Sequence, residues 1–323
     1  MINKKNIISL IIGIVLTSII VSIILNIIDW TETWEIIKTV SFKYLIFGCL
    51  SILASIFVRS FRWWKISTYP KKEIHLFIKA VFIGYMGNFL IPFRAGELIR
   101  IWVVYKLGNK NAIKITLLSI TDRATDFLII SSIMVLIIPF VNLPDQLKPI
   151  QFFSIIVFII LISISFIGFL YKYSIKNYLN SYSKNEGKFF KLFKKLILNS
   201  IEIIETLSKA PFSFLFIFLL VALFDMLSIW FVMLSLGWSL PLISVALYLV
   251  IMSFASILPA TPGYIGLYQI SAIVTFGLYD IGINQAFAYS ILLQGITAFS
   301  YLTFGSFALL LITPSIIKSY RGS

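Results

Sequence analysis

The stretch NFLIPFRAGELIR, residues 88–100, places three charged side chains inside an apolar sequence. Arg94, Glu97 and Arg100 follow one another at intervals of three around a proline and a glycine. If a helix begins near Ala95, Glu97 and Arg100 share one face and can pair, whereas Arg94 stays at the bend. An arginine fork binds two phosphate oxygens at once, and the N–H groups at a helix start add to such an anion site. We therefore expect Arg94 or Arg100 to contact a phosphate. The alternative is that the three charges only hold the bend together.

A second charged set follows in TDRATDFL, residues 121–128. Asp122 and Asp126 are four residues apart and share one helix face, where they repel each other unless a cation or a proton intervenes. Arg123 lies about 100° around the helix and is a third candidate phosphate ligand. We prefer an ion-pair clamp between these acids and Arg94 or Arg100. Charges at a helix start near the membrane surface and a proton relay are the alternatives.

Asp225 is the most isolated acid, about midway along the apolar run 212–236. It has no cation three or four residues away, so its partner must come from another helix, or a wet cavity must solvate it. Ser228 is placed to donate a hydrogen bond to it. Ionisable residues within membrane spans mark either a site or a structural pair, and both roles remain open for Asp225.

The composition is that of a membrane protein. Of the 323 residues, 59% are hydrophobic and 12% are charged, and the mean hydropathy is +0.99. Several apolar runs exceed the roughly 18 residues that cross a bilayer as a helix. We expect an all-α polytopic protein with one integral membrane domain, residues 1–323. The first run, Ile7–Ile28, is too long for a signal-peptide core and is expected to remain as a span.

The formal charge of +14 is distributed along the chain as in membrane proteins. Lysines and arginines gather between Arg59 and Arg123, in 172–210 and at both termini. This positive-inside pattern predicts that 172–210 and both termini are cytoplasmic. It also predicts that 142–149 and 237–241 lie on the outer side of the cell membrane. It favours contact with anionic lipid head groups and indicates no nucleic-acid partner. Only three lysines lie in the other connections: Lys38, Lys43 and Lys148.

The apolar runs predict about six full spans and two re-entrant hairpins, at about 76–110 and 242–279. The run Ala80–Phe93 has 14 residues, too few to cross a hydrocarbon core of roughly 30 Å at 1.5 Å per residue. The Trp-flanked edge 62–65 is expected to anchor at the membrane interface. The segment 191–209 is either an amphipathic surface helix or a plain basic loop. The full spans are expected at Ile7–Ile28, Tyr44–Phe61, Ile115–Phe140, Ile150–Tyr171, Phe212–Leu236 and Gln285–Ile312.

Both hairpins are interrupted by the pattern Pro-x-x-x-Gly, at 92–96 and 259–263. The charge-derived topology places the first hairpin on the cytoplasmic side and the second on the outer side. Paired broken helices of opposite orientation predict an inverted repeat with a substrate site where their tips meet. Arg94 and Glu97 should then lie near 261–269. The residues expected to break the helices are Pro92, Gly96, Pro259, Pro262, Gly263 and Gly266.

Three segments, 87–100, 121–128 and 258–269, resemble in this order the lysylphosphatidylglycerol synthase transmembrane, or flippase-like, family. This family includes the membrane half of the multiple peptide resistance factor and stand-alone proteins. The resemblance covers nearly the whole chain and implies a lipid-translocating module without the synthase. The family pattern often has an acid where Gln269 stands and an arginine near Gln294. The resemblance thus implies that the second hairpin has lost its charges here.

The sequence favours a transporter that moves an anionic or modified phospholipid, or a polyprenyl-phosphate carrier, across the membrane. A non-catalytic partner of a lipid-modifying synthase is the first alternative, and an integral glycosyl- or acyltransferase is the second. The sequence has one cysteine, one histidine, no metal-ligand spacing and no ATP-binding motif. We therefore expect no enzyme activity, metal or cofactor. The expected partners are membrane lipids, with a second copy of the chain or a synthase as protein partners.

Overall fold

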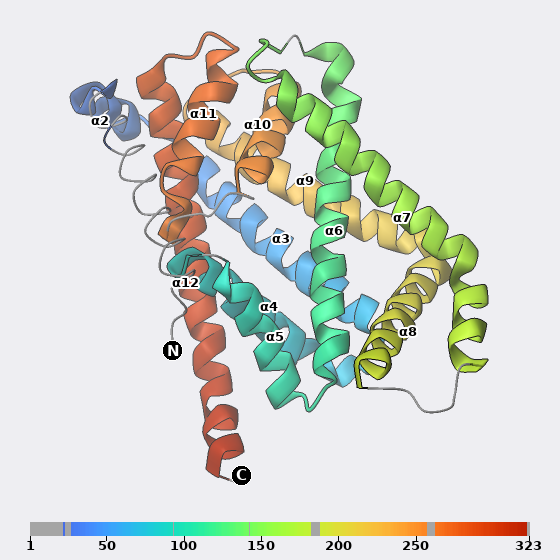
Figure 1. Ribbon diagram of the computed structural model, residues 1–323. Coiled ribbons are helices and arrows are strands. Elements are labelled where there is room, and N and C mark those ends of the chain that lie inside the picture. Colours follow the sequence, from blue (N-terminus) through green and yellow to red (C-terminus); the bar gives the residue numbers. More distant parts are fainter. Residues whose placement is uncertain are drawn as a thin grey trace.

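The computed structural model describes residue 22 and residues 27–92, 94–141, 143–181, 188–256 and 262–321. The predicted first span lies almost entirely outside these ranges. Within them the chain forms helices and no strand (Figure 1). Five of these helices are long and apolar enough to cross a membrane, and they match five of the six predicted spans. The expected all-α polytopic membrane fold is therefore confirmed. The five are α3 (Phe42–Ser67), α6 (Ala112–Ile137), α7 (Lys148–Ser181), α9 (Pro211–Ser235) and α12 (Ile283–Arg321).

Two pairs of short helices occupy the places of the predicted hairpins. The first pair is α4 (Ile74–Leu90) and α5 (Ala95–Leu107), and the second is α10 (Leu242–Ala255) and α11 (Leu267–Gly277). The longest, α4, has 17 residues, so it extends about 25 Å, less than the roughly 30 Å of a hydrocarbon core. The members of each pair pack against each other, and the chain enters and leaves each pair at the same end of the bundle (Figure 1).

The remaining elements are short or peripheral. Helix α2 (Trp30–Lys38) packs on the start of α12, and α8 (Lys188–Lys209) packs against α6 and α7. The loop alternative for 191–209 is therefore wrong, because these residues are helical. The short 3-10 turns are η1 (Lys71–Glu73), η2 (Ile138–Phe140) and η3 (Pro262–Tyr264).

The two ends of the helix bundle differ in charge. The turn from α5 to α6 lies at the lower end in Figure 1. Around this turn, Lys110 and Lys114 lie over the ring of Tyr69, and Lys114 pairs with Glu202 of α8. At the upper end, the backbone N–H of Ser41 donates to Ser235, and Trp238 stacks on Tyr289. The segments expected in the cytoplasm thus meet at one end, and those expected outside meet at the other. This agrees with the charge-derived topology, although it is the positive-inside rule that assigns the cytoplasm to the basic end.

Contacts between helices repeat in the two halves of the chain. If α3, α4, α5 and α6 correspond to α9, α10, α11 and α12, the packing of α4 on α12 corresponds to that of α10 on α6. The contacts of α3 with α4 and of α5 with α6 likewise have counterparts in α9 with α10 and α11 with α12. Helices α3 and α9 pack on each other, as expected for corresponding helices that lie next to the pseudo-two-fold axis relating the two halves. Because the hairpins enter from opposite ends, this is the packing that an inverted repeat predicts.

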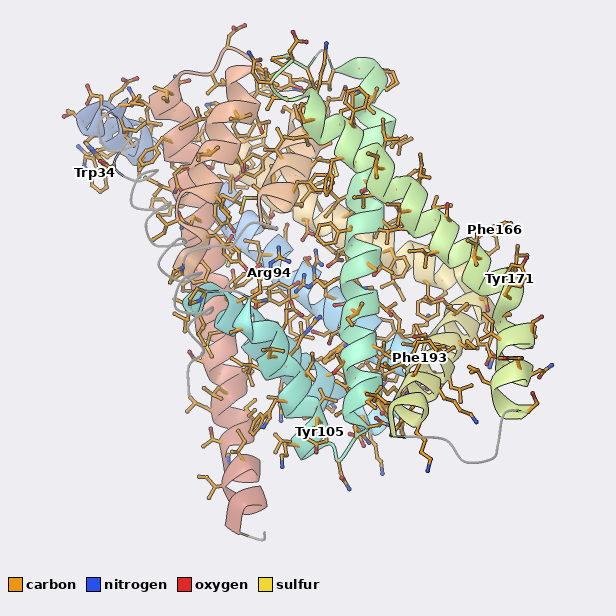
Figure 2. The ribbon with its side chains drawn as sticks, in the orientation of Figure 1. Trp34, Arg94, Tyr105, Phe166, Tyr171 and Phe193 are labelled. Carbon is orange, nitrogen blue, oxygen red and sulfur yellow. The ribbon has the colours of Figure 1, made fainter. Side chains whose placement is uncertain are left out.

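The broken ends of the two hairpins meet inside the bundle. The guanidinium of Arg94 donates to the carbonyl and the hydroxyl of Ser256, at 2.5 and 2.7 Å. Helix α4 contacts η3, where a Cβ on Gly263 would lie 3.5 Å from the ring of Phe89. Figure 2 places Arg94 at mid-height between Trp34 at the upper end and Tyr105 at the lower one. The two tips therefore approach each other, and the hydrogen-bonded partner of Arg94 is Ser256, just outside the predicted range 261–269.

The break residues differ in part from the prediction. In the second hairpin, Gly263 and Gly266 have φ of 72° and 90°, so glycine does permit the turn. In the first hairpin the left-handed residue is Arg94, with φ of 53°, and Gly96 is the second residue of α5. The prediction that Gly96 breaks the helix is wrong. Pro92 lies in the bend and Pro262 begins η3, whereas Pro259 is outside the described residues.

Gly96 instead allows two backbones to touch. A Cβ on Gly96 would lie 1.8 Å from the carbonyl oxygen of Gly84 and 2.5 Å from the backbone nitrogen of Asn88. Since both neighbours are main-chain atoms of α4, a side chain rotation cannot relieve the clash. The glycine holds α5 close to α4, which fixes where the charged residues of α5 point.

Helix α3 continues beyond its predicted end at Phe61, and this changes the role of its basic residues. Arg62 and Trp63 are both 0% exposed. The expectation that they anchor at the membrane interface is wrong, because the helix carries them into the bundle. By contrast, α7 keeps its apolar side chains outward, including Phe166 and Tyr171 (Figure 2), as expected for a face that contacts lipid.

The close approach at Gly96 gives a stability prediction. Gly96→Ala is expected to lower the melting temperature in detergent and the folded yield, since overpacking a tight contact costs about 1–3 kcal/mol or more. Gly295→Ala is the matched control, because a Cβ there meets nothing within 4 Å. It should leave the melting temperature unchanged or raise it, as alanine favours a helix over glycine. Equal melting temperatures for both variants would contradict the close packing of α4 on α5.

The charge difference between the two ends gives a topology prediction. After Cys49 is replaced by serine, cysteines introduced at Asn109 and Ser239, both exposed, should react with an impermeant thiol reagent from opposite sides of sealed vesicles. The positive-inside rule predicts that Ser239→Cys is labelled from outside and Asn109→Cys only after permeabilisation. Labelling of both from one side would overturn the opposite entry of the hairpins.

Candidate functional site

Eight charged side chains from four helices form one ion-pair network in the middle of the bundle. Helix α3 contributes two arginines, α5 an acid and an arginine, α6 two acids and an arginine, and α9 one acid. Four positive charges balance four negative ones, as buried ions must be balanced in a membrane interior. The members are Arg59, Arg62, Glu97, Arg100, Asp122, Arg123, Asp126 and Asp225.

Six of these residues form a closed ring. Arg62 joins Asp122 at 2.5 Å and Asp126 at 2.8 Å. Arg100 joins Asp122 at 3.0 Å and Glu97 at 2.7 Å. Arg123 closes the ring between Glu97 and Asp126. Each member therefore has two partners of opposite charge, and the ring ties α3, α5 and α6 together.

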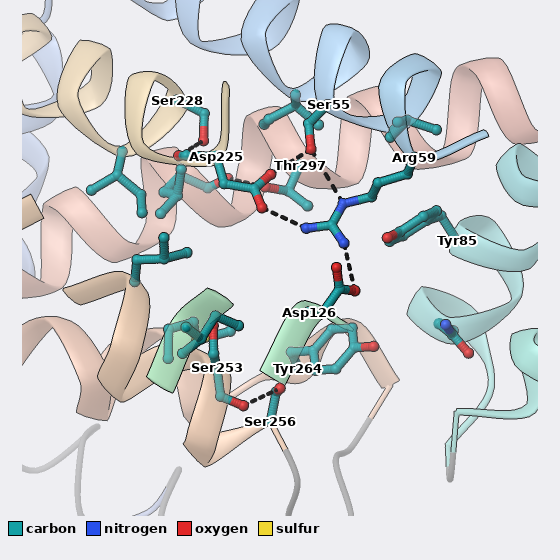
Figure 3. A pocket seen from close by; sticks show the side chains of 18 of the residues that line it. Ser55, Arg59, Tyr85, Asp126, Asp225, Ser228, Ser253, Ser256, Tyr264 and Thr297 are labelled. Carbon is teal, nitrogen blue, oxygen red and sulfur yellow. Dashed lines mark hydrogen bonds and ion pairs between the residues drawn. The ribbon is translucent and has the colours of Figure 1, made fainter. Parts of the chain in front are cut away.

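A branch leaves the ring toward the second half. The guanidinium of Arg59 bridges Asp126 at 2.6 Å and Asp225 of α9 at 2.5 Å (Figure 3). The hydroxyl of Ser55 donates to the other oxygen of Asp225 at 2.5 Å. Ser228 donates to the main-chain carbonyl of Asp225, not to the carboxylate as expected. Asp225 thus has a partner from another helix, one of the two outcomes that the sequence left open.

Aromatic rings shield the buried part of the network. The guanidinium carbon of Arg100 lies 4.8 Å from the centre of the Trp63 ring, and that of Arg62 lies 5.5 Å from the Phe218 ring. Stacking of this kind attracts a cation and excludes water. Arg62 is 0% exposed and Arg100 is 2% exposed. These two arginines are structural in this arrangement, since reaching a ligand would strip them of two carboxylates each.

A cavity of about 220 Å³ lies beside the branch, between the two hairpins. One wall carries Arg59 and Asp225, and the opposite wall carries Ser253, Ser256 and Tyr264 (Figure 3). Both halves of the chain contribute. The lining is rich in hydroxyl groups, which belong to Ser55, Tyr85, Ser228, Tyr248, Ser253, Ser256, Tyr264, Tyr268, Thr297 and Tyr301.

Arg94 is the cavity-lining arginine that pairs with no carboxylate in the part of the chain that the structure describes. Its guanidinium is held by the two oxygens of Ser256, which are neutral acceptors. It precedes the first turn of α5, whose N–H groups add positive potential. Of the three arginines predicted to contact a phosphate, Arg94 is the one left with its charge uncompensated.

The second hairpin has amides where the first has charges. Glu97 is the third residue of α5 and pairs with Arg123, which lies eleven residues into α6 from Ala112. Gln269 is the third residue of α11 and donates at 2.8 Å to Gln294, which lies eleven residues into α12 from Ile283. The two pairs therefore occupy equivalent places in the repeat. The second hairpin thus has a neutral amide pair where the first has an ion pair.

These amides hold the second break in place. Gln269 accepts from the backbone N–H of Gly266, and Gln294 donates to the carbonyl of Gly263, both at 2.7 Å. The left-handed glycines are thus fixed by side chains from α11 and α12. In the described part of the break, side-chain hydrogen bonds therefore hold both left-handed glycines.

The structure brings the predicted site residues together, with corrections to their roles. The pairing of Glu97 with Arg100 and the clamp between Asp122 and Arg100 are as predicted. Arg94 takes no part in that clamp. Arg123, the third candidate phosphate ligand, instead pairs with Glu97 of the first hairpin. The phosphate role expected for Arg100 does not fit its burial between two acids.

Sequence reasoning missed Arg59 and Arg62, which supply four of the eight ion pairs. Both were counted among the basic residues that set topology. The missed signal is their spacing of three, which puts two arginines on one face of a helix that continues past them. Such a face needs acids opposite, and Asp122 and Asp126 are the pair with matching spacing.

These features define a class of protein: a polytopic α-helical membrane protein with two broken-helix hairpins around a polar internal cavity. Residues 9–305 match the family model described as lysylphosphatidylglycerol synthase TM region, so the chain belongs to that family. No curated protein and no solved structure matches the chain. The resemblance noted in the three sequence segments is confirmed, and with it a membrane protein of lipid metabolism or transport.

The ring predicts that removing one of its acids lowers the stability of the fold more than removing an exposed acid elsewhere. Asp122→Asn leaves Arg62 and Arg100 with one carboxylate each, so it should destabilise the protein by about 3–5 kcal/mol, the usual cost of breaking a buried ion pair. Asp145→Asn is the control, because Asp145 is 88% exposed in its pair with Lys148. Thermal unfolding in detergent measures both. A melting temperature for Asp122→Asn equal to that of the control would show that the ring does not hold the helices together.

Proposed function

We propose that this chain moves the head group of an anionic or modified lipid across the cell membrane, through the cavity between the two hairpins. The observation that carries the proposal is Arg94, an unpaired guanidinium at the meeting point of two oppositely oriented hairpins. A substrate site at such a meeting point is typical of transporters built from inverted repeats. Membership in a family named for a lipid synthase membrane region supports a lipid as the substrate.

The residues divide the task between them. The ring keeps α3, α5 and α6 together, so it fixes the side of the cavity from which Arg94 projects. Arg94 and Ser256 join the two hairpins through hydrogen bonds to neutral oxygens. A phosphate is a stronger acceptor than a hydroxyl or a carbonyl, because hydrogen bonds to charged groups are stronger. Binding of a phosphate would therefore displace Ser256 and loosen the contact between the hairpins.

This loosening links binding to movement. In an inverted repeat, one half rocks against the other and opens the central site to alternate sides. A ligand that replaces a bridging contact favours this rearrangement, since it binds the separated state better than the closed one. The sequence has no ATP-binding motif, so we propose that movement is downhill or driven by an ion gradient.

A transporter is favoured over an enzyme because the polar groups of the cavity are arranged in pairs. Asp126 and Asp225 both bind Arg59, and although the hydroxyl of Ser55 contacts Asp225, no histidine is among the described residues that line the cavity to act as a base beside it. The role of a passive partner for a synthase is tested by the same experiment as transport. Movement of lipid in liposomes that contain only this protein excludes it.

Arg94 and Arg100 should respond differently to substitution. Arg94→Ala is expected to slow lipid movement in proteoliposomes by about tenfold or more at near-normal folded yield, since it removes a charged hydrogen bond worth about 1.5–3 kcal/mol. Arg100→Ala should lose folded yield first, because it removes one of the two cationic partners of each buried acid, Glu97 and Asp122. The measurement is the rate at which a labelled phospholipid becomes accessible to an impermeant quencher.

Arg94→Lys refines this test. Lysine keeps the charge but not the fork, so a two-oxygen phosphate contact should be impaired, whereas a simple positive potential should survive. Wild-type rates in both Arg94 variants would end the role of Arg94 in the proposed function. Absence of movement in wild-type liposomes would remove the transport proposal itself.

A further inference from the structure

The charges around the cavity do not cancel. Among the described residues, the network and Arg94 together contain five arginines and four carboxylates. The sequence between Ser256 and Pro262, ILPAT, adds no ionisable side chain. The site therefore carries one positive charge in excess. A ligand with one negative charge, such as a phosphodiester, would neutralise it.

No described acid that lines the cavity is available to bind a cation. The two lining carboxylates are Asp126 and Asp225, and Arg59 holds both within 2.6 Å. An ammonium group on the ligand would reach carboxylates whose charge Arg59 already offsets, and it would lie beside that guanidinium. Like charges this close repel each other, most strongly in a low-dielectric interior.

The second half offers neutral hydrogen-bonding groups instead. The amide pair Gln269–Gln294, which does not line the cavity, replaces the acid and the arginine of the first half and keeps this side of the cavity uncharged. Ser253, Ser256 and Tyr264 line the wall across from Arg59 (Figure 3). Hydroxyl groups suit a ligand that also carries hydroxyls, since each can donate and accept.

The size of the cavity limits what enters. About 220 Å³ is below the 300–1,000 Å³ typical of pockets for drug-sized ligands, so the cavity holds a head group and not a whole lipid.

We infer that the substrate is a phosphodiester lipid whose head group bears a single negative charge and an uncharged, hydroxyl-rich substituent such as glycerol or a sugar. The phosphate binds Arg94, and the hydroxyl-rich part binds the wall of the second half. The site discriminates against amine-bearing head groups, including a lysyl ester. This inference rests on the proposed function and names its substrate class.

Binding to the purified full chain tests the class without requiring movement. The protein in nanodiscs of neutral lipid is offered equal amounts of phosphatidylglycerol, phosphatidylinositol, phosphatidylethanolamine and lysyl-phosphatidylglycerol with identical tails, and bound lipid is counted by mass spectrometry. We expect at least about tenfold enrichment of the two hydroxyl-bearing lipids over the two amine-bearing ones, as leaving a buried charge unpaired costs at least that much. Equal binding, or a preference for the amine-bearing lipids, overturns the inference.

A water-soluble probe shows whether the cavity binds the phosphodiester head group itself or whether only the lipid tails bind. Glycerophosphoglycerol, which has the head group without tails, should displace bound phosphatidylglycerol, and Arg94→Ala should abolish the displacement. Lipid binding that is neither displaced nor selective among head groups would show that only the tails bind, and would overturn the inference.

A paired substitution can reverse the preference. Ser253→Asp places an unpaired carboxylate on the neutral wall, and Ser253→Asn is its uncharged control. The aspartate variant should gain binding of lysyl-phosphatidylglycerol relative to phosphatidylglycerol by about tenfold, and the asparagine variant should not. If Ser253→Asp does not fold, Thr297→Asp and Thr297→Asn serve in its place, since Thr297 also lines the cavity. An unchanged ratio in the folded aspartate variant contradicts the inference.

The transport assay separates the two proposals. Movement of all four lipids at one rate keeps the proposed function and overturns the substrate class. No movement of any lipid, with selective binding retained, removes the proposed function and leaves the specificity of the cavity standing.

Discussion

Asp126 is the carboxylate on which the rest of the charged network depends. Three arginines pair with it: Arg59 and Arg62 from α3, and Arg123 from its own helix. It belongs both to the closed ring and to the branch that reaches Asp225. Because unpaired ions are so costly inside a membrane protein, the four helices that carry these residues must keep their positions together. Packing at Gly96, where α5 touches α4, fixes the position of α5 and so of its two ring members, Glu97 and Arg100.

The repeat is symmetric in its packing and asymmetric in its chemistry. Glu97 and Arg123 carry opposite charges, whereas Gln269 and Gln294 at the equivalent places share a neutral hydrogen bond. A neutral hydrogen bond contributes about 1 kcal/mol, and separating a buried ion pair costs about 3–5 kcal/mol. The second hairpin therefore separates from its neighbour at lower cost than the first. The first half supplies a rigid charged frame, and the second supplies the neutral wall that faces it.

The sequence predicted local pairing well and distant pairing poorly. Helical spacing was enough to join Glu97 with Arg100, and a count of cations within one turn showed that any ion-pair partner of Asp225 must come from another helix. The length of the apolar runs predicted both hairpins. Arg59 and Arg62 were missed because the positive-inside rule already explained them. That rule places basic residues on a side of the membrane, but it does not say whether a helix carries them into the bundle.

Glycine illustrates the same limit from another direction. Gly96 and Gly263 follow the same sequence pattern, yet only Gly263 has a positive φ. The pattern identifies where a chain must turn, and the packing of neighbouring helices decides which residue takes the strained conformation. Gly84 and Asn88 of α4 leave no room for a Cβ at Gly96, so its smallness is used for contact. The turn then falls on the residue two positions earlier.

That residue is Arg94, whose φ of 53° is a left-handed conformation that glycine or asparagine would adopt at lower cost. Strain of this kind persists where the surroundings impose it, and it is concentrated at functional positions. Here the conformation directs the side chain away from the charged ring and across to Ser256 on the other hairpin. A glycine at this position would ease the turn and remove the only cavity-lining guanidinium that no described carboxylate neutralises. The strained backbone and the unpaired charge thus have one explanation, which is that the bend exists to present this guanidinium where the two halves meet.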